Sequence, residues 1–489
     1  MGCERRRRQE NIRRTGSVLQ FLAALRLLLI LFLLFSVGCS LEAIVEDAPT
    51  LGTKGRVFVY LQPLPQESRS LTFVLEQLAA VSEDGSLKPL ESSSLEIKGD
   101  AFSGRQKLLT AAILPSGSYQ GLSLVIAAAT ISGEEGETNL LVPEQPLLIS
   151  QKFHLLPGND QALFLTLLPE NLVAQGYRFS PSFSLGVPRR LTRNFTGFAS
   201  QTATHTVTVF NKRTMEVFCL LSPGTTPRGM ALDDRSGRLY VALAGDDAVA
   251  VIDVDTLEEV GRVGLFFGDR PVELALAVNG DTLVAANQGS RTLSIIDTAS
   301  LYERHRVQLN SEPAWVVADR SGRQVYVLQA MDNSVAIIDL ASGVQLTTIV
   351  LDEVPEHGAL SRDGNQLYVV GRRSGDLLVV DLQQLAVVDK IFVGGGSSAI
   401  TADSRTNLVY IGKQSGEVVL VDAAAQMVLD SCMVPGDVRH LAIDGEENSL
   451  FILSAGERLI HKVDLVGKQG LGRVETAEGG YSLVIMGAR

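Results

Sequence analysis

The sequence has few of the residues that build disulfide frameworks and soft-metal sites. Its 489 residues include four cysteines and one tryptophan. Cys3 and Cys39 lie near the N-terminus, so only Cys219 and Cys432 remain for the body of the chain, too few for a disulfide framework. No C-x-x-C pair, no C-x-x-C-H haem attachment and no Cys/His group at zinc spacing is present. We therefore expect no metal site and no bound cofactor.

The motifs of common enzymes and the charge of nucleic-acid-binding proteins are also missing. The chain has no G-x-S-x-G elbow, no phosphate-binding loop and no H-E-x-x-H. Its net charge is −12, and residues 1–38 contribute +5, which leaves −17 for the remainder. Because phosphates require a basic face, a body this acidic excludes nucleic acid as a partner.

A membrane-spanning run is absent as well, although the N-terminus is apolar. The uninterrupted apolar stretch covers 27–37 and would be about 16 Å long as a helix, against the ~30 Å of a bilayer core. Extending it backwards places Arg26 inside, at a cost of ~2.5 to 3.5 kcal/mol if central. The "RRRR" run at 5–8 lies just ahead of the apolar stretch, as in the basic start of a signal peptide. Residues 1–38 are therefore predicted to be a signal peptide.

The end of this stretch, "SVGCS", resembles the lipobox of bacterial lipoproteins. The resemblance implies that Cys39 is lipidated, for example with palmitate, and becomes the new N-terminus; Ser36 departs from the pattern, where Leu is usual. Ser40, instead of the Asp that retains lipoproteins at the inner membrane, implies an outer-membrane anchor with a periplasmic or surface-facing body. The alternative is an ordinary cleavage site beside an incidental cysteine. Residues 39–54 would form the tether.

Strand and turn signals define a small domain over residues 55–188. Short apolar segments separated by turns such as "EDGS" and "LPSGSY" predict a β-sandwich of about seven or eight strands. The order of these segments resembles an uncharacterised family of bacterial secreted and lipoprotein domains, which brings no catalytic residues with it. His154, the only histidine of this part, is interpreted as a partly buried structural residue rather than a ligand. A linker over 189–196 follows.

The C-terminal part, residues 197–489, contains a repeat of about 42 residues. A strand-like segment ends in an aspartate at each of six positions: Asp253, Asp297, Asp339, Asp381, Asp422 and Asp464. An aromatic or valine precedes each mark by 13 residues, or by 12 in one repeat: Tyr240, Val284, Tyr326, Tyr368, Tyr410 and Phe451. A unit of four strands and about 40 to 45 residues is a propeller blade.

The two ends of this region settle the number of blades. Residues 197–221 align with the last three strands of a blade, and residues 481–489 align with a first strand. With six complete repeats between them, the sequence predicts a seven-bladed β-propeller in which N- and C-terminal strands close one blade. The fold class is therefore all-β, a propeller preceded by a small β-sandwich. Cys219 and Cys432 fall on outer strands of blades that are not neighbours, so no disulfide is expected between them.

The second strands of the repeats read "YVAL", "LVAAN", "YVLQ", "YVVG" and "YIGK", and the units resemble the YVTN repeats of bacterial surface and periplasmic propellers, although none is intact. This resemblance implies an envelope protein that acts as a binding or scaffolding module. The alternative is a propeller hydrolase of lactonase type or an accessory protein of a periplasmic redox system. Acidic turns such as "DDRSG" lack the D-x-D-x-D-G spacing of calcium loops and are interpreted as hairpin turns.

Propellers commonly bind partners at the mouth of the central channel, where the innermost strands begin. Counting one and two residues beyond the proline position at which these strands start gives the candidate binding set: Arg228, Glu273, Trp315, Glu356, His357, Arg439 and His440. Trp315 would offer a stacking surface, the arginines would hold an anion, and the Glu and His side chains would form hydrogen bonds or titrate. The expected ligand is a protein or a small molecule. Against this, exposed turns are polar in any case and Trp315 could pack between blades.

Overall fold

The computed structural model describes residues 53–487, apart from residues 91–93, 103, 134–135, 187–192 and 372. The described part is all-β, with two short 3-10 helices, η1 (Gln66–Ser68) and η2 (Arg193–Phe195). None of its helices has the length and apolar character that a membrane crossing requires. The predicted signal peptide, the lipidation of Cys39 and most of the tether lie outside the described residues.

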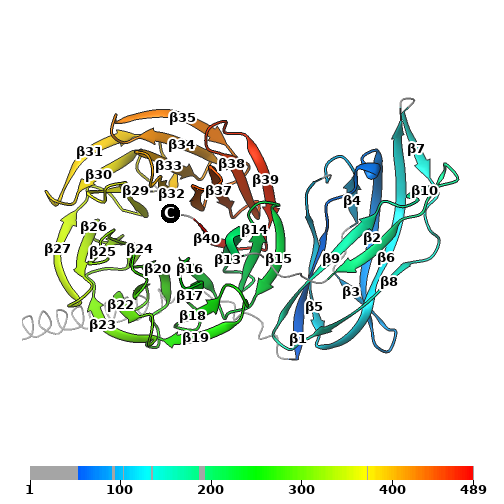
Figure 1. The fold of residues 1–489 in the computed structure, drawn as a ribbon, viewed down its shortest axis with the longest axis horizontal. Coiled ribbons are helices and arrows are strands. Elements are labelled where there is room, and N and C mark those ends of the chain that lie inside the picture. The colour runs from blue at the N-terminus through cyan, green and yellow to red at the C-terminus, as the bar shows by residue number, and fades with distance from the viewer. Residues whose placement is uncertain are drawn as a thin grey trace, which may run out of the picture. The chain divides into compact units, whose positions relative to one another are not determined.

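The N-terminal domain is a sandwich of two sheets (Figure 1). The first sheet has the order β12 (Ser182–Gly186), β9 (Asp160–Leu168), β1 (Lys54–Leu61) and β5 (Lys107–Pro115). The second has the order β3 (Leu87–Leu90), β2 (Leu71–Ser82), β6 (Gly117–Gly133) and β7 (Gly136–Leu140), with β4 (Leu95–Lys98) also on β2 and β8 (Leu147–Leu155) also on β6. A separate short pair joins β10 (Val173–Ala174) and β11 (Arg178–Phe179).

The two main sheets hold ten strands rather than the predicted seven or eight. The difference arises because β2 and β6, with 12 and 17 residues, each pair along one edge with two successive short strands. One pairing in the sandwich, between β1 and β9, is parallel, and no local turn pattern announces it.

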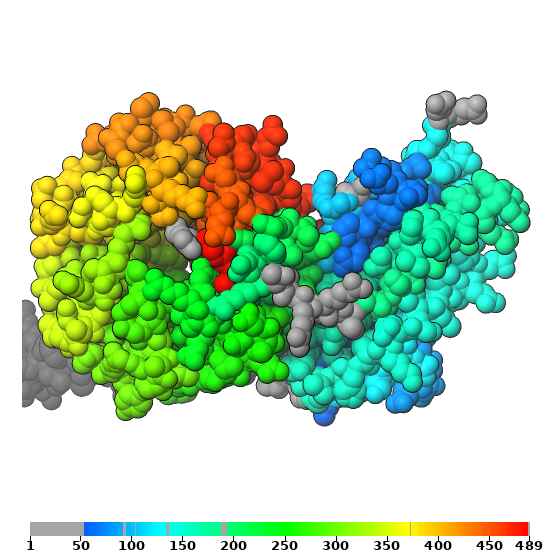
Figure 2. Space-filling view, in the orientation of Figure 1, coloured from blue at the N-terminus to red at the C-terminus, as the bar shows by residue number. Residues whose placement is uncertain are grey.

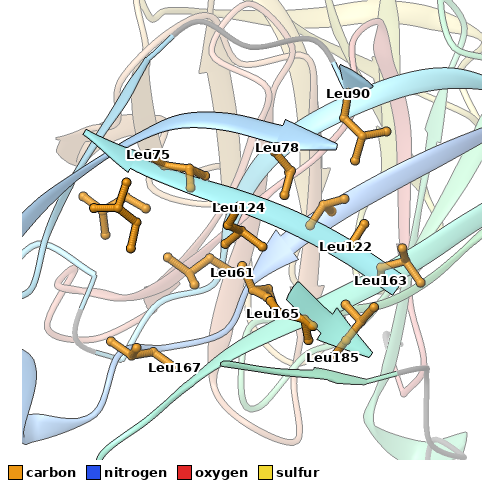
Figure 3. Close-up of a cluster of buried hydrophobic side chains, with 14 of the residues drawn as sticks. Leu61, Leu75, Leu78, Leu90, Leu122, Leu124, Leu163, Leu165, Leu167 and Leu185 are labelled. Carbon is orange, nitrogen blue, oxygen red and sulfur yellow. The ribbon is translucent and has the colours of Figure 1, made fainter. Parts of the chain in front are cut away.

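Alternation of side chains builds the sandwich core. In β9, Leu163, Leu165 and Leu167 lie in the core between the sheets, and Figure 3 shows them beside the leucines of β2 and β6. The intervening Phe164 points to the other face and packs with propeller residues such as Phe451. The same alternation corrects one expectation: His154 is exposed, between buried Phe153 and Leu155, and its ring nitrogen lies 3.1 Å from the Ser118 hydroxyl.

The C-terminal domain consists of seven four-stranded antiparallel sheets arranged in a ring around a common axis (Figure 1). Blades 1 to 3 are β16 (Pro227–Asp233), β17 (Arg238–Leu243), β18 (Ala248–Asp253) and β19 (Glu259–Gly264); β20 (Pro271–Leu276), β21 (Thr282–Asn287), β22 (Thr292–Asp297) and β23 (Tyr302–Gln308); and β24 (Pro313–Ala318), β25 (Gln324–Gln329), β26 (Ser334–Asp339) and β27 (Val344–Val350). Blades 4 to 6 are β28 (His357–Leu360), β29 (Gln366–Val370), β30 (Asp376–Asp381) and β31 (Ala386–Phe392); β32 (Ser397–Ala402), β33 (Leu408–Lys413), β34 (Glu417–Asp422) and β35 (Met427–Met433); and β36 (His440–Asp444), β37 (Ser449–Ser454), β38 (Leu459–Asp464) and β39 (Gly470–Glu475).

Blade 7 confirms the predicted closure. It joins β13 (Thr196–Gln201), β14 (Thr206–Asn211) and β15 (Glu216–Leu221) to the C-terminal β40 (Gly480–Ile485), which pairs antiparallel with β13. A buried ammonium reinforces this junction: Lys212 Nζ donates to the Met486 carbonyl at 2.7 Å and lies 2.6 Å from the Asp444 carboxylate of blade 6. One side chain thus links blade 6, blade 7 and the closing strand.

The aspartates that mark the repeat have a structural cause. Each ends the third strand of its blade, and its carboxylate accepts backbone N–H groups of the following turn, as Asp381 does from Gln383 and Gln384 at 2.8 and 2.7 Å. Four residues after each aspartate the backbone turns into the left-handed region, for example at Gln426 with φ 55° and at Gly343 with φ 67°. A short carboxylate at this position caps the turn, which explains its regular spacing.

The hydrophobic cores of the ring lie between blades rather than within them. Each of seven buried clusters combines residues from two adjacent blades, as Val284 of blade 2 packs with Val325 of blade 3. No blade therefore buries its apolar faces alone. Cys219 and Cys432 are free thiols on β15 and β35, the outer strands of blades 7 and 5, and burial raises the pKa of the Cys219 thiol to about 12.

Candidate functional site

The seven predicted site residues lie at or just before the start of the innermost strands of five blades. Arg228 is the second residue of β16, and Glu273 and Trp315 are the third residues of β20 and β24. His357 and His440 are the first residues of β28 and β36. Glu356 and Arg439 immediately precede the two histidines. The strand starts thus gather the set at one end of the channel.

Three aromatic side chains of this set contact one another. The Trp315 ring stacks on His357, with centroids 3.9 Å apart and an interplanar angle of 23°. His440 lies 5.9 Å from Trp315 and 6.2 Å from His357 between ring centroids. Since blades 3 and 6 are not neighbours in the ring, the three side chains meet across the channel.

The arginines meet around a residue that the sequence reasoning missed. Tyr481, in β40, lies with its ring 4.6 Å from the Arg439 guanidinium and 5.6 Å from that of Arg228. Arg439 also lies 3.8 Å from the Glu356 carboxylate. Tyr481 occupies the same place in blade 7 as the predicted residues in the others, but its strand begins with Gly480 rather than a proline. We call the seven predicted residues and Tyr481 the mouth cluster.

Glu273 is the most deeply buried acid of the mouth cluster. Its side chain is 3% exposed, and burial raises the pKa of its carboxyl to about 8, although Arg439 acts in the opposite direction. The carboxyl group is therefore mostly protonated at pH 7. Gly229 makes room for it, because a Cβ atom there would lie 2.6 Å from the Glu273 Cα.

Four polar atoms of the mouth cluster have no hydrogen-bond partner in the described part of the chain. They are Arg228 Nε, Glu273 Oε2, Trp315 Nε1 and His440 Nδ1. Burial, together with the charge of Arg439, lowers the pKa of His440 to about 4, so this imidazole is neutral at pH 7. Buried polar atoms are usually satisfied, and four unsatisfied ones from four blades call for a physical explanation.

A cavity of about 400 Å³ lies along the second halves of the inner strands; its lining begins one or two residues beyond Arg228, Glu273 and His440 and includes no residue of the mouth cluster. We call it the axial cavity; it is lined by Met230, Ala231, Leu232, Asp234, Leu274, Leu276, Thr401, Ala402, Leu441, Ala442, Ile443, Leu483, Val484 and Ile485. Figure 2 shows the ring hollowed at its centre. The volume falls within the ~300 to 1,000 Å³ typical of ligand sites.

Trp315 also has the role expected of a residue that packs between blades. Its ring packs partly against the core between blades 3 and 4, while it stacks on His357. Within the ranges that the structure describes, no three His, Cys, Asp or Glu side chains come together as a metal-binding group.

Comparisons with known proteins support the fold but show no family for this chain. No known family profile matches the sequence, and no curated protein matches it. Among solved structures, a functionally unknown protein from Desulfotomaculum acetoxidans matches with a TM-score of 0.55 and 12% identity over 60% of this chain and 99% of that one. Hydrazine synthase of Kuenenia stuttgartiensis (TM-score 0.47, 18% identity, 53% of this chain and 89% of that one) and the dihydro-heme d1 dehydrogenase NirN (0.49, 14%, 61% and 77%) are also similar. At these identities the likeness concerns the fold alone.

Proposed function

We propose that the protein is a lipid-anchored binding module of the bacterial cell envelope, whose propeller receives a ligand in the axial cavity. The observation that carries the proposal is the set of four unpartnered polar atoms in the mouth cluster. A ligand that supplied donors and acceptors there would remove an unfavourable feature of the unliganded ring. The cluster would bind the polar end of this ligand and the cavity its remainder.

The charges of the mouth cluster narrow the chemistry of the ligand. At pH 7 the raised pKa of Glu273 and the lowered pKa of His440 leave both groups neutral. Arg228 and Arg439 bring two guanidinium groups to the cluster, and Glu356 brings one carboxylate beside Arg439. A carboxylate head, on a small molecule or at a protein C-terminus, suits this balance, since guanidinium groups bind carboxylates well.

Affinity capture from detergent-solubilised envelopes tests the binding role. The wild-type chain, Trp315→Ala and the matched surface control Arg235→Gln are used as baits; Arg235 is exposed on a turn of blade 1. We expect a ligand or partner that wild type and control retain and Trp315→Ala loses. If all three baits retain the same molecules, the mouth cluster does not bind them and the proposal fails.

The anchor is a separate part of the proposal and has its own test. The "SVGCS" stretch supports lipidation of Cys39, and Ser40 supports an outer-membrane destination. Because one acyl chain anchors only marginally, stable attachment requires more than one. We expect a palmitate analogue to label the wild-type protein and not Cys39→Ala; an unlabelled wild type would leave only a cleaved signal peptide.

A further inference from the structure

A second cavity, away from the mouth cluster, lies where the sandwich meets blades 6 and 7. Its volume is about 360 Å³. We call it the arginine cavity; it is lined by Gly104, Arg105, Arg213, Thr214, Met215, His461, Gly470, Leu471, Gly472 and Arg473. Three distant stretches of the chain form this cavity, and all of them belong to one compact unit, residues 51–489.

The charge of the lining is the reverse of that of the chain. Three arginines line the arginine cavity and no carboxylate does, although the whole chain has a net charge of −12. Like charges repel one another when they share a small, partly desolvated space. Arg105 and Arg213 are exposed and Arg473 is half-buried, so solvent screens part of this repulsion, and an anion between the three side chains would be attracted by all of them.

Two of the three arginines have no direct partner among the described residues, although the Glu475 carboxylate acts on Arg473 from a distance. Within the described ranges, the side chains of Arg105 and Arg473 have no hydrogen-bond or ion-pair partner, and burial together with the charge of Arg105 lowers the pKa of Arg473. Arg213, by contrast, is held in place by an ion pair with Glu447 and by the Phe195 ring, 3.8 Å from its guanidinium.

The walls between the arginines leave room for a ligand. Gly470 is exposed and has no atom within 4 Å of the position that a Cβ atom would take, so a side chain placed there would occupy the open side of the cavity. His461, directly across the strand pair from Arg473, is 8% exposed, and no partner for its Nε2 atom is present in the described part of the chain.

We propose that the arginine cavity binds a phosphate-type oxyanion with two negative charges. Guanidinium groups match the oxygens of such an anion in charge and geometry, and two of the three here are free to do so. The anion is either free phosphate or the phosphomonoester headgroup of a lipid. This site is independent of the mouth cluster, with which it shares no residue.

The test uses the full chain in a non-ionic detergent, titrated separately with inorganic phosphate and with glycerol 3-phosphate, the headgroup of phosphatidate. Binding is measured by calorimetry and as the rise in Tm at constant ionic strength with chloride. We expect saturable binding that weakens by about tenfold or more in Arg473→Gln and is unchanged in the control Arg235→Gln. Tighter binding of one probe identifies the source of the phosphate group.

The folding of the variant provides an internal control. Because Arg473→Gln removes a repelling charge, its Tm without phosphate should equal or exceed that of the wild type. Gly470→Leu, which fills the cavity without changing charge, should also lose binding. Absence of binding to both probes, or equal binding by wild type and Arg473→Gln, would overturn the proposal.

Discussion

The sandwich and the ring reach stability in different ways. The sandwich has one core, shared by both sheets, which forms when strands from the whole domain meet. The ring has seven cores, each between two adjacent blades, and the seventh-blade sheet is completed by the last strand of the chain. A ring therefore depends on its closure in a way that a sandwich does not.

The largest effect is expected from opening the ring. Deleting residues 481–489 removes most of β40 and exposes the edge of β13. We expect the propeller to lose most of the about 5 to 15 kcal/mol that stabilises a typical domain. Thermal unfolding with an unchanged midpoint and cooperativity would show that closure does not hold the ring together.

Breaking the ion pair at the closure should cost less. Lys212 and Asp444 are 1% and 0% exposed, so Lys212→Met leaves a buried carboxylate without its partner. We expect a loss of about 3–5 kcal/mol, largely recovered in the double variant with Asp444→Leu. Chemical denaturation of the four proteins measures the coupling, and additive losses would contradict it.

Neighbouring residues of strand β9 pack in the two different regions of the molecule. Leu165 packs in the sandwich core, whereas Phe164 packs in the cluster that includes blades 6 and 7. Leu165→Ala should cost about 2–5 kcal/mol and raise hydrogen exchange in β2 and β6. Phe164→Ala should raise exchange in blades 6 and 7 as well. Identical exchange patterns in the two variants would mean that the regions unfold as one.

A smaller, pH-dependent effect is expected at the channel. The folded pKa of Glu273 is raised to about 8, so the native state holds a proton that the unfolded chain has released, and stability falls as pH rises from about 4.5 to 8. Glu273→Gln should remove this fall, so its gain in stability over the wild type should grow as the pH rises, to a few kcal/mol (roughly 1.4 kcal/mol per pKa unit of the shift) near pH 8. Chemical denaturation across this pH range gives the difference; a constant difference would refute the assigned pKa shift.

The smallest effect on stability is expected from a substitution in a single turn. Gln426 is exposed and takes a left-handed conformation in blade 5, at the position where blade 3 has Gly343. Gln426→Gly should stabilise the ring by up to about 1 kcal/mol, because glycine adopts this conformation without steric cost. Gln383→Gly serves as the control. It places a glycine two residues after Asp381, rather than four residues after the aspartate, and should not stabilise the ring.

The features readable from the sequence are those with a local cause. The six aspartates from Asp253 to Asp464 predict the third strand of each of blades 1 to 6, because each carboxylate caps the turn that follows its strand. Tyr481 was missed because the inner strand of blade 7 lacks the proline used for counting. The arginine cavity could not be predicted, since Arg105 and Arg473 are brought together only by packing between domains.

The central claim, that the mouth cluster is where the ring binds its ligand, can be measured through the chain's only tryptophan. Trp315 stacks on His357, so its fluorescence reports on this site without interference from other tryptophans. Titration with the captured molecule should change the emission of the wild-type protein saturably and require a higher concentration in Arg439→Gln, whereas phosphate should leave the emission unchanged. Binding of the captured molecule with no change in Trp315 emission would place the ligand elsewhere and contradict the account.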